Sequence, residues 1–172
     1  HRDLHSFPTR RSSDLLQTID LEEFYVAGER ISLDIKDQLF QGMVLREKDF
    51  REFIKTNQWS SFEGKHVAIQ CSADAIVPTW AYMLLSVALK PFAKTILFGS
   101  LEELETQLFK SNLDAIDWSK YENAKVVIKG CSKVKVPIAT YVDVTSRLQP
   151  IASSIMFGEP CSTVPIFKRL KK

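Results

Sequence analysis

The chain has 172 residues, of which 45% are apolar, with 23 lysines and arginines against 21 aspartates and glutamates. This composition predicts a core of ordinary size, and the near-neutral charge excludes the strongly basic face of a typical nucleic-acid binder. The longest apolar stretch, around 81–89, is too short for a membrane helix, which needs about 20 residues. Three cysteines form an odd set and no Asn-x-Ser/Thr sequon occurs, so we expect a cytoplasmic protein. We expect neither nucleic acid nor membrane among its partners.

The first 15 residues differ in character from everything that follows. The segment from His5 to Leu15 resembles a translated sequencing-adapter oligonucleotide, so we set residues 1–15 aside as an artefact. They hold three basic and two acidic residues, which leaves a net charge of +1 and a single histidine, His66, in the rest of the chain. We expect residues 16–172 to form a single α/β domain.

Residues 16–60 are predicted to form a small N-terminal cap element of short strands and one helix. Alternating apolar residues at 30–34 and 39–45 are typical of strands. A helix is predicted over 47–57, because its apolar residues recur at intervals of three and four against a charged opposite face.

Two stretches of the remaining chain are copies of one unit. Residues 67–99 and 126–158 align without a gap at an offset of 59 residues, and 11 of 33 positions are identical, where chance gives about two. We predict a first repeat at 66–110 and a second at 125–168. The predicted strands are 66–70, 95–98, 125–129 and 154–157, and the predicted helices are 78–89, 101–110 and 138–148. This alternation predicts an α/β fold with a mostly parallel sheet built from a duplicated β-α-β unit.

The boundaries of these helices have local causes. Pro78 and Pro137 stand where the two repeat helices begin, a position at which the missing N–H is harmless. Ser100, with Glu103 three residues later, forms the pattern of a capping box. The first repeat helix is apolar on nearly all sides, so we expect it to be more buried than the second.

Each cysteine of the chain opens a Cys-Ser step that follows a predicted strand, at Cys71, Cys131 and Cys161. Because the carboxyl ends of parallel strands meet at one edge of a sheet, we expect the three thiols at that edge. Thiolates are the ligands that zinc, copper(I) and iron–sulfur clusters prefer. Three cysteines leave one position for Asp74, His66 or water. We therefore predict that Cys71, Cys131 and Cys161 hold zinc or an iron–sulfur cluster, with Asp74 as a further metal ligand.

Two other interpretations of the cysteines remain open. Free cysteines pack as small hydrophobic side chains, which would make the protein a non-catalytic protein-interaction domain. A single cysteine at a helix start could instead act as a nucleophile or redox sensor, without a second histidine to form a Cys-His pair. Tyr82 and Tyr141 recur at one repeat position, either to place hydroxyls in a site or to fill the same packing slot twice. The common catalytic motifs are absent from the sequence, so enzyme status stays open.

Three segments carry a resemblance to a known family: Cys71 to Met83, Lys129 to Ser132, and Phe157 to Pro165. Together with Gly28-Glu-Arg and Asp34-Ile-Lys-Asp upstream, they are similar to the bacterial family catalogued as domain of unknown function 2480, from Thr18 to the C-terminus. The resemblance implies no particular activity. It implies genes near those of iron–sulfur assembly, and hence iron–sulfur assembly or acceptor proteins as partners. We expect an accessory or carrier protein of cluster metabolism.

Overall fold

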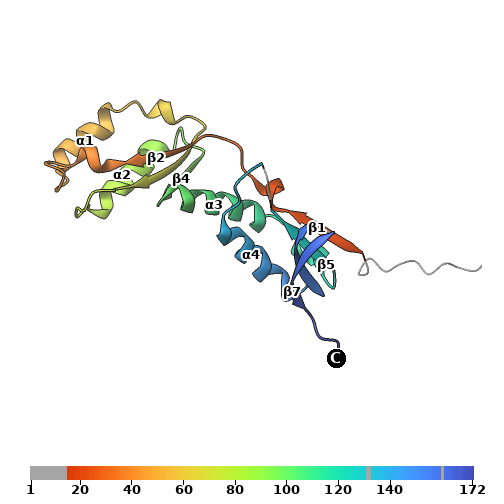
Figure 1. Ribbon diagram of the computed structural model, residues 1–172. Coiled ribbons are helices and arrows are strands. Elements are labelled where there is room, and N and C mark those ends of the chain that lie inside the picture. The colour runs from red at the N-terminus through yellow and green to blue at the C-terminus, as the bar shows by residue number, and fades with distance from the viewer. Residues whose placement is uncertain (1–14, 131–132, 160) are drawn as a thin grey trace, which may run out of the picture. The chain divides into compact units, whose positions relative to one another are not determined.

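The computed structural model describes residues 15–130, 133–159 and 161–172. The adapter-like segment, apart from Leu15, and Cys131 therefore lie outside the described residues. The chain divides into two compact units. The inserted unit spans Ala27–Gln107, and the host unit joins the residues up to Val26 with Leu108–Lys172. Figure 1 shows the elements of both units.

The inserted unit contains one parallel three-stranded sheet. Its strands pair in the order β2-β3-β4, all parallel. Helices α1 and α2 pack their apolar residues with β2 and β3 into one core that includes Phe50, Val67 and Leu85. Its elements in chain order are β2 (Arg30–Asp34), the 3-10 helix η3 (Ile35–Gln38), α1 (Glu47–Thr56), η4 (Trp59–Phe62), β3 (His66–Gln70), α2 (Thr79–Leu89), β4 (Thr95–Phe98) and the first half of α3 (Leu101–Asp114).

The host unit contains a four-stranded sheet in the order β1-β5-β6-β7. The first three strands are parallel and β7 is antiparallel to β6. A second core includes Phe109, Val126 and Leu148. Its elements are β1 (Leu16–Asp20), η2 (Leu21–Phe24), the second half of α3 (Leu101–Asp114), η5 (Trp118–Tyr121), β5 (Lys125–Lys129), α4 (Ile138–Leu148), β6 (Ser154–Glu159) and β7 (Ser162–Lys168).

The predicted fold class is confirmed, since the chain is α/β with mostly parallel strands and an N-terminal strand region. Ser100 and Glu103 also form the predicted capping box, with Glu103 N–H donating to Ser100 Oγ at 3.1 Å and Ser100 N–H to Glu103 Oε2 at 2.6 Å. Whether the two units make a single domain with the predicted boundaries stays a prediction.

The repeat extends further than the sequence comparison indicated. Trp59 and Trp118, again 59 residues apart, each donate their indole N–H to the carbonyl five residues earlier, at 2.7 and 3.0 Å. Asp20 and Asp34 close the first strand of each unit, and each caps the 3-10 helix that follows. The host unit is therefore a second copy of the inserted unit, with its first strand β1 placed ahead of that unit in the chain.

One prediction about burial is wrong. Helix α2 buries Ala81, Leu85 and Leu89, the same three repeat positions that α4 buries with Thr140, Val144 and Leu148. The outer face of α2 is apolar yet open to solvent, since Met83 and Val87 are 64% and 73% exposed. The apolar character of α2 on all sides thus reports an exposed apolar face rather than deeper burial.

Candidate functional site

The predicted function, metal or iron–sulfur binding through three cysteines at one sheet edge, is wrong. The strands make two sheets instead of one, so Cys71 follows β3 of the inserted unit while Cys161 lies between β6 and β7 of the host unit. No single sheet edge collects the ends of β3, β5 and β6, as the prediction required. Among the described residues, no group of three or more His, Cys, Asp or Glu side chains is placed to hold a metal ion.

The individual side chains of that prediction have other surroundings. Cys71 is half-buried, packs against the core, and its thiol donates to the Ala73 carbonyl at 3.8 Å. Cys161 and Asp74 are exposed. His66 is buried, and both ring nitrogens are engaged at 2.8 Å, with Thr95 Oγ1 and the Ala27 carbonyl. A ligand role for single cysteines stays untested, because Cys131 lies outside the described residues.

An apolar pocket of about 280 Å³ lies on the host unit, between α4 and strands β5, β6 and β7. Tyr141 of α4 stands edge-on to Phe157 of β6, with ring centroids 5.8 Å apart and an interplanar angle of 82°. This is the T-shaped geometry that aromatic pairs favour. The side chains around the pair complete the lining: Ile128, Ile138, Thr145 and Ile166.

The position of Tyr141 depends on a glycine. A Cβ atom at residue 130 would lie 1.5 Å from Tyr141 Oη, so the phenol occupies the space that any other residue's side chain would fill. Burial raises the pKa of Tyr141, and the negative charges of Asp20 and Glu22 raise it further. The phenol is therefore neutral at physiological pH and offers one hydroxyl beside apolar walls.

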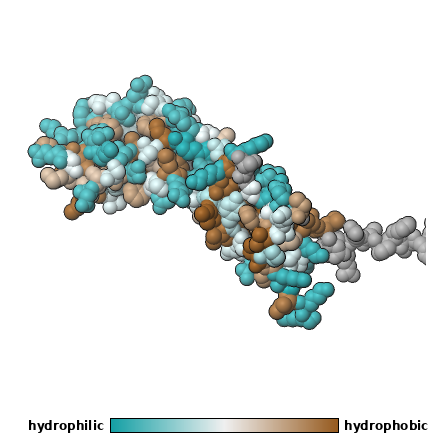
Figure 2. All heavy atoms as spheres, viewed as in Figure 1, coloured by the Kyte–Doolittle hydropathy of each residue, from teal (hydrophilic) through white to brown (hydrophobic). Residues whose placement is uncertain are grey.

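The surface around the pocket is unusually apolar for an exposed region. Ile138 is 80% exposed, and Ile166 and Phe157 are each nearly half exposed. Val164 of β7 lies opposite Phe157 in the strand register, so it extends the same face. Figure 2 shows apolar side chains reaching the surface of both units among hydrophilic neighbours. Exposed apolar surface of this kind is typical of interaction sites.

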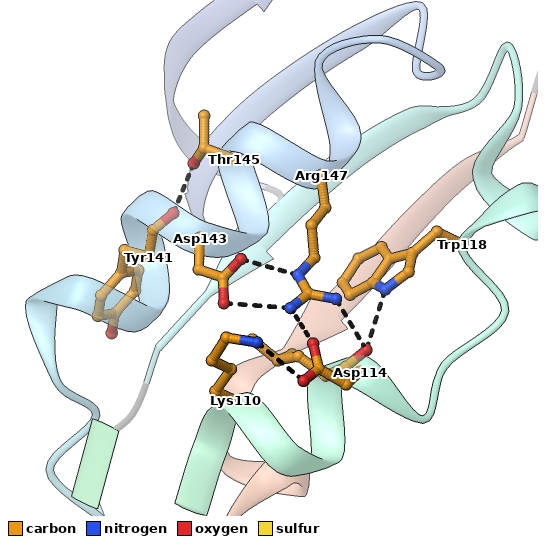
Figure 3. Close-up of polar contacts among 8 residues, drawn as sticks. Lys110, Asp114, Trp118, Tyr141, Asp143, Thr145 and Arg147 are labelled. Carbon is orange, nitrogen blue, oxygen red and sulfur yellow. Dashed lines mark hydrogen bonds and ion pairs between the residues drawn. The ribbon is translucent and has the colours of Figure 1, made fainter. Parts of the chain in front are cut away.

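Helix α4, which carries Tyr141, is held by a network around Arg147 (Figure 3). The Arg147 guanidinium donates to Asp143 at 2.8 Å and to Asp114 of α3, and it lies 5.7 Å from the centre of the Trp118 ring. Lys110 binds the other oxygen of Asp114 at 2.8 Å. Hydrogen bonds from Lys110 and Arg147 lower the pKa of Asp114. The network joins α4 to the end of α3 and to η5, and so fixes one wall of the pocket.

The inserted unit repeats the aromatic pair. Tyr82 of α2 stands edge-on to Phe98 of β4 at 4.9 Å and 72°. Asp34, at the end of β2, accepts the N–H groups of Ser72 and Lys36 at 3.1 and 3.0 Å. Partial burial raises the pKa of Asp34, but these hydrogen bonds and that of the Ser72 hydroxyl outweigh it, and the net pKa is lowered. Burial, with the charges of Cys71 and Asp34, raises the pKa of Tyr82.

The sequence indicated only part of this site. The match of Tyr141 with Tyr82 in the repeat marks it as a candidate in the sequence. Ile138 and Ile166 were missed, because single exposed apolar residues carry no signal until the fold brings them together. The available signal was the apolar alternation after Cys161, which extends the second repeat by a strand that the first repeat lacks.

Comparison with known proteins gives a family and no activity. No curated protein and no solved structure matches the chain. No helix among the described residues is long and apolar enough to cross a membrane. A family model described as "Protein of unknown function (DUF2480)" matches residues 9–169, so the chain belongs to this family, in agreement with the resemblance of its motifs.

Proposed function

We propose that the protein is a non-catalytic protein-interaction module whose host unit binds an apolar segment of a partner. The observation that carries the proposal is the apolar pocket around Tyr141 and Phe157. Contiguous apolar patches on a protein surface are typical of interaction sites. Aromatic residues in such a patch supply large contact area at a low cost in conformational entropy.

The chemistry of the pocket favours binding over catalysis. Among the described residues that line it there is no acid, base or thiol. The one hydroxyl besides that of Tyr141, on Thr145, already donates to the Tyr141 carbonyl at 2.7 Å. A volume of about 280 Å³ is below that of most pockets for whole small molecules. We infer that the pocket receives one or two large apolar side chains of a partner protein.

A substitution at the rim tests this proposal with little risk to folding. Peptides selected from a random library on the purified protein should share a large apolar residue. Ile138→Asp should weaken their binding at least tenfold in fluorescence anisotropy, because a carboxylate cannot be desolvated against the pocket. Leu170→Asp, in the same unit and 88% exposed outside the pocket, is the matched control and should bind normally. Equal binding by both variants would refute the proposal.

Two further expectations accompany this function. We propose a cytoplasmic location, supported by the odd number of cysteines and the lack of a glycosylation sequon. We also propose iron–sulfur assembly or acceptor proteins as partners, supported only by the family resemblance. If the selected peptides match no segment of such proteins, the result would argue against these partners.

A further inference from the structure

The inserted unit lacks a strand that the host unit has at the same place. The sequence of β4 and the following glycine, Thr-Ile-Leu-Phe-Gly, matches that of β6, Ser-Ile-Met-Phe-Gly. In the host unit β7 pairs with the outer edge of β6, whereas β4 is the last strand of its sheet in the described part of the chain. We infer that the outer edge of β4 binds an antiparallel β-strand of a partner protein. This site is separate from the proposed pocket and does not depend on it.

The backbone of β4 offers the hydrogen bonds that such a strand needs. In a parallel ladder, alternate residues direct both N–H and C=O to the same neighbour. Gly99 N–H donates to the Ile69 carbonyl at 2.9 Å, so Thr95 and Leu97 face β3. Ile96 and Phe98 then direct their N–H and C=O groups to the outer side. Unpaired groups of this kind form a template for strand addition.

The side chains beside this edge match the surface that β7 covers in the host unit. Phe98 is 67% exposed, whereas its equivalent Phe157 is 41% exposed and lies opposite Val164 of β7. Each phenylalanine has a tyrosine standing edge-on to it. An incoming strand with valine or isoleucine opposite Phe98 would therefore bury apolar surface as β7 does.

The other edge strands carry features that discourage pairing, and β4 does not. Strand β1 ends with the charged residue Asp20. Strand β7 contains Pro165 and ends at Lys168, and β2 begins and ends with the charged residues Arg30 and Asp34. Proline and charge are common means of protecting an edge. The four residues of β4 include neither.

Charge determines which kind of strand fits. In the host unit, the carboxyl end of the antiparallel strand lies at the start of β6, where Lys168 is opposite Ser154. The equivalent position in the inserted unit is next to Lys90 and Lys94, which are exposed and have no ion-pair partner among the described residues. A strand ending in acidic residues is favoured there. The chain's own β7, which ends in Lys168-Arg169, would be repelled, so a second copy is not the favoured occupant.

A peptide probe tests this inference directly. The peptide Ser-Thr-Val-Pro-Ile-Phe-Glu-Glu copies β7 and replaces its basic end. We expect saturable binding in fluorescence anisotropy, and binding at least about tenfold weaker at low salt for the same peptide ending in Lys-Lys. The lack of saturable binding up to about 1 mM peptide would contradict the inference, as would equal binding of the acidic and basic peptides.

Two controls separate strand addition from general apolar contact. N-methylation removes backbone N–H donors. Only one set of alternate peptide residues directs its N–H groups to β4, so methylation of that set should abolish binding and methylation of the other set should not affect it. Equal effects of both sets would overturn the inference. In the protein, Phe98→Lys should abolish binding, while Val87→Lys, at a similarly exposed position, should not. Ile138→Asp distinguishes the two proposals, since it removes binding at the pocket and not at this edge.

Discussion

The inserted unit and the host unit are two versions of one fold that differ by a single strand. Both place a tyrosine from the second helix edge-on to a phenylalanine at the end of the third strand, at 4.9 Å in one and 5.8 Å in the other. The host unit adds β7, whose Ile166 lines the pocket beside the aromatic pair. The inserted unit leaves the same pair and the strand edge uncovered. On our two proposals, one scaffold presents two binding surfaces, an apolar pocket and an open strand edge.

The largest expected effect comes from equivalent core positions. Leu89 and Leu148 are both fully buried, so Leu89→Ala and Leu148→Ala should each lower the free energy of unfolding by about 3 kcal/mol. Urea denaturation followed by far-UV circular dichroism measures this. If the chain is the single domain that its length predicts, both variants shift one common transition. Two transitions, each shifted by only one variant, would show two domains. A loss of less than about 1 kcal/mol in the free energy of unfolding for either variant would contradict the equivalence of the two cores.

Gly130 of the host unit and Cys71 of the inserted unit occupy the same repeat position, but only Cys71 carries a side chain there. Gly130→Ala should destabilise the protein by about 2 kcal/mol, because its Cβ collides with the Tyr141 phenol. Tyr141→Ala in the same chain should relieve much of that loss. Cys71→Ala, the matched change in the inserted unit, should cost less, since that site already holds a side chain. Thermal unfolding of the three variants measures these effects. A neutral Gly130→Ala would contradict the close approach of the Tyr141 phenol to residue 130.

Thr140 is the polar counterpart of the buried Ala81. Its hydroxyl is buried and has no hydrogen-bond partner among the described residues. Thr140→Val keeps the shape and removes the unsatisfied group, so stability should rise by about 1 kcal/mol in chemical denaturation. A decrease of similar size would show that the hydroxyl has a partner.

The turn before the second strand of each unit, β3 in one and β5 in the other, requires a left-handed backbone. Gly64 has φ +69° and Asn123 has φ +57° at equivalent positions. Asn123→Ala should cost about 1 kcal/mol, because alanine tolerates this conformation poorly, and Asn123→Gly should be nearly neutral. Melting temperatures of the pair measure the difference, and equal values would be inconsistent with the backbone conformation.

The smallest effect is a pH dependence confined to the host unit. The pKa of Asp114 is lowered by Lys110 and Arg147 in the folded protein. Its contribution to stability is therefore present above the unfolded-state pKa and is lost as pH falls through the folded pKa. Asp114→Asn should flatten the fall in melting temperature below about pH 4. Since Asp114 is a surface group the change is small, and an unchanged pH profile would show that the pairs do not persist in solution.

The sequence was sufficient for the class of fold and for the local structure. Periodicity located the repeat strands and helices, and Ser100 with Glu103 marked the start of α3, because these signals are local. Strand pairing is not local, so nothing in the sequence near Leu16–Asp20 indicated that β1 pairs with β5, more than 100 residues later. The assumption of one sheet led directly to the wrong cysteine site. The sequence of α2 also predicted burial for a face that is exposed, since apolar residues that face water and those that face a core have the same pattern.

The most direct test of two separate surfaces is methyl NMR of isoleucine-labelled protein titrated with the two kinds of peptide. The account predicts that a peptide selected for the pocket shifts the signals of Ile138 and Ile166 and leaves that of Ile96 unchanged. The acidic strand peptide should shift Ile96 and spare the other two. Both peptides shifting the same signals, or neither shifting any, would contradict the account.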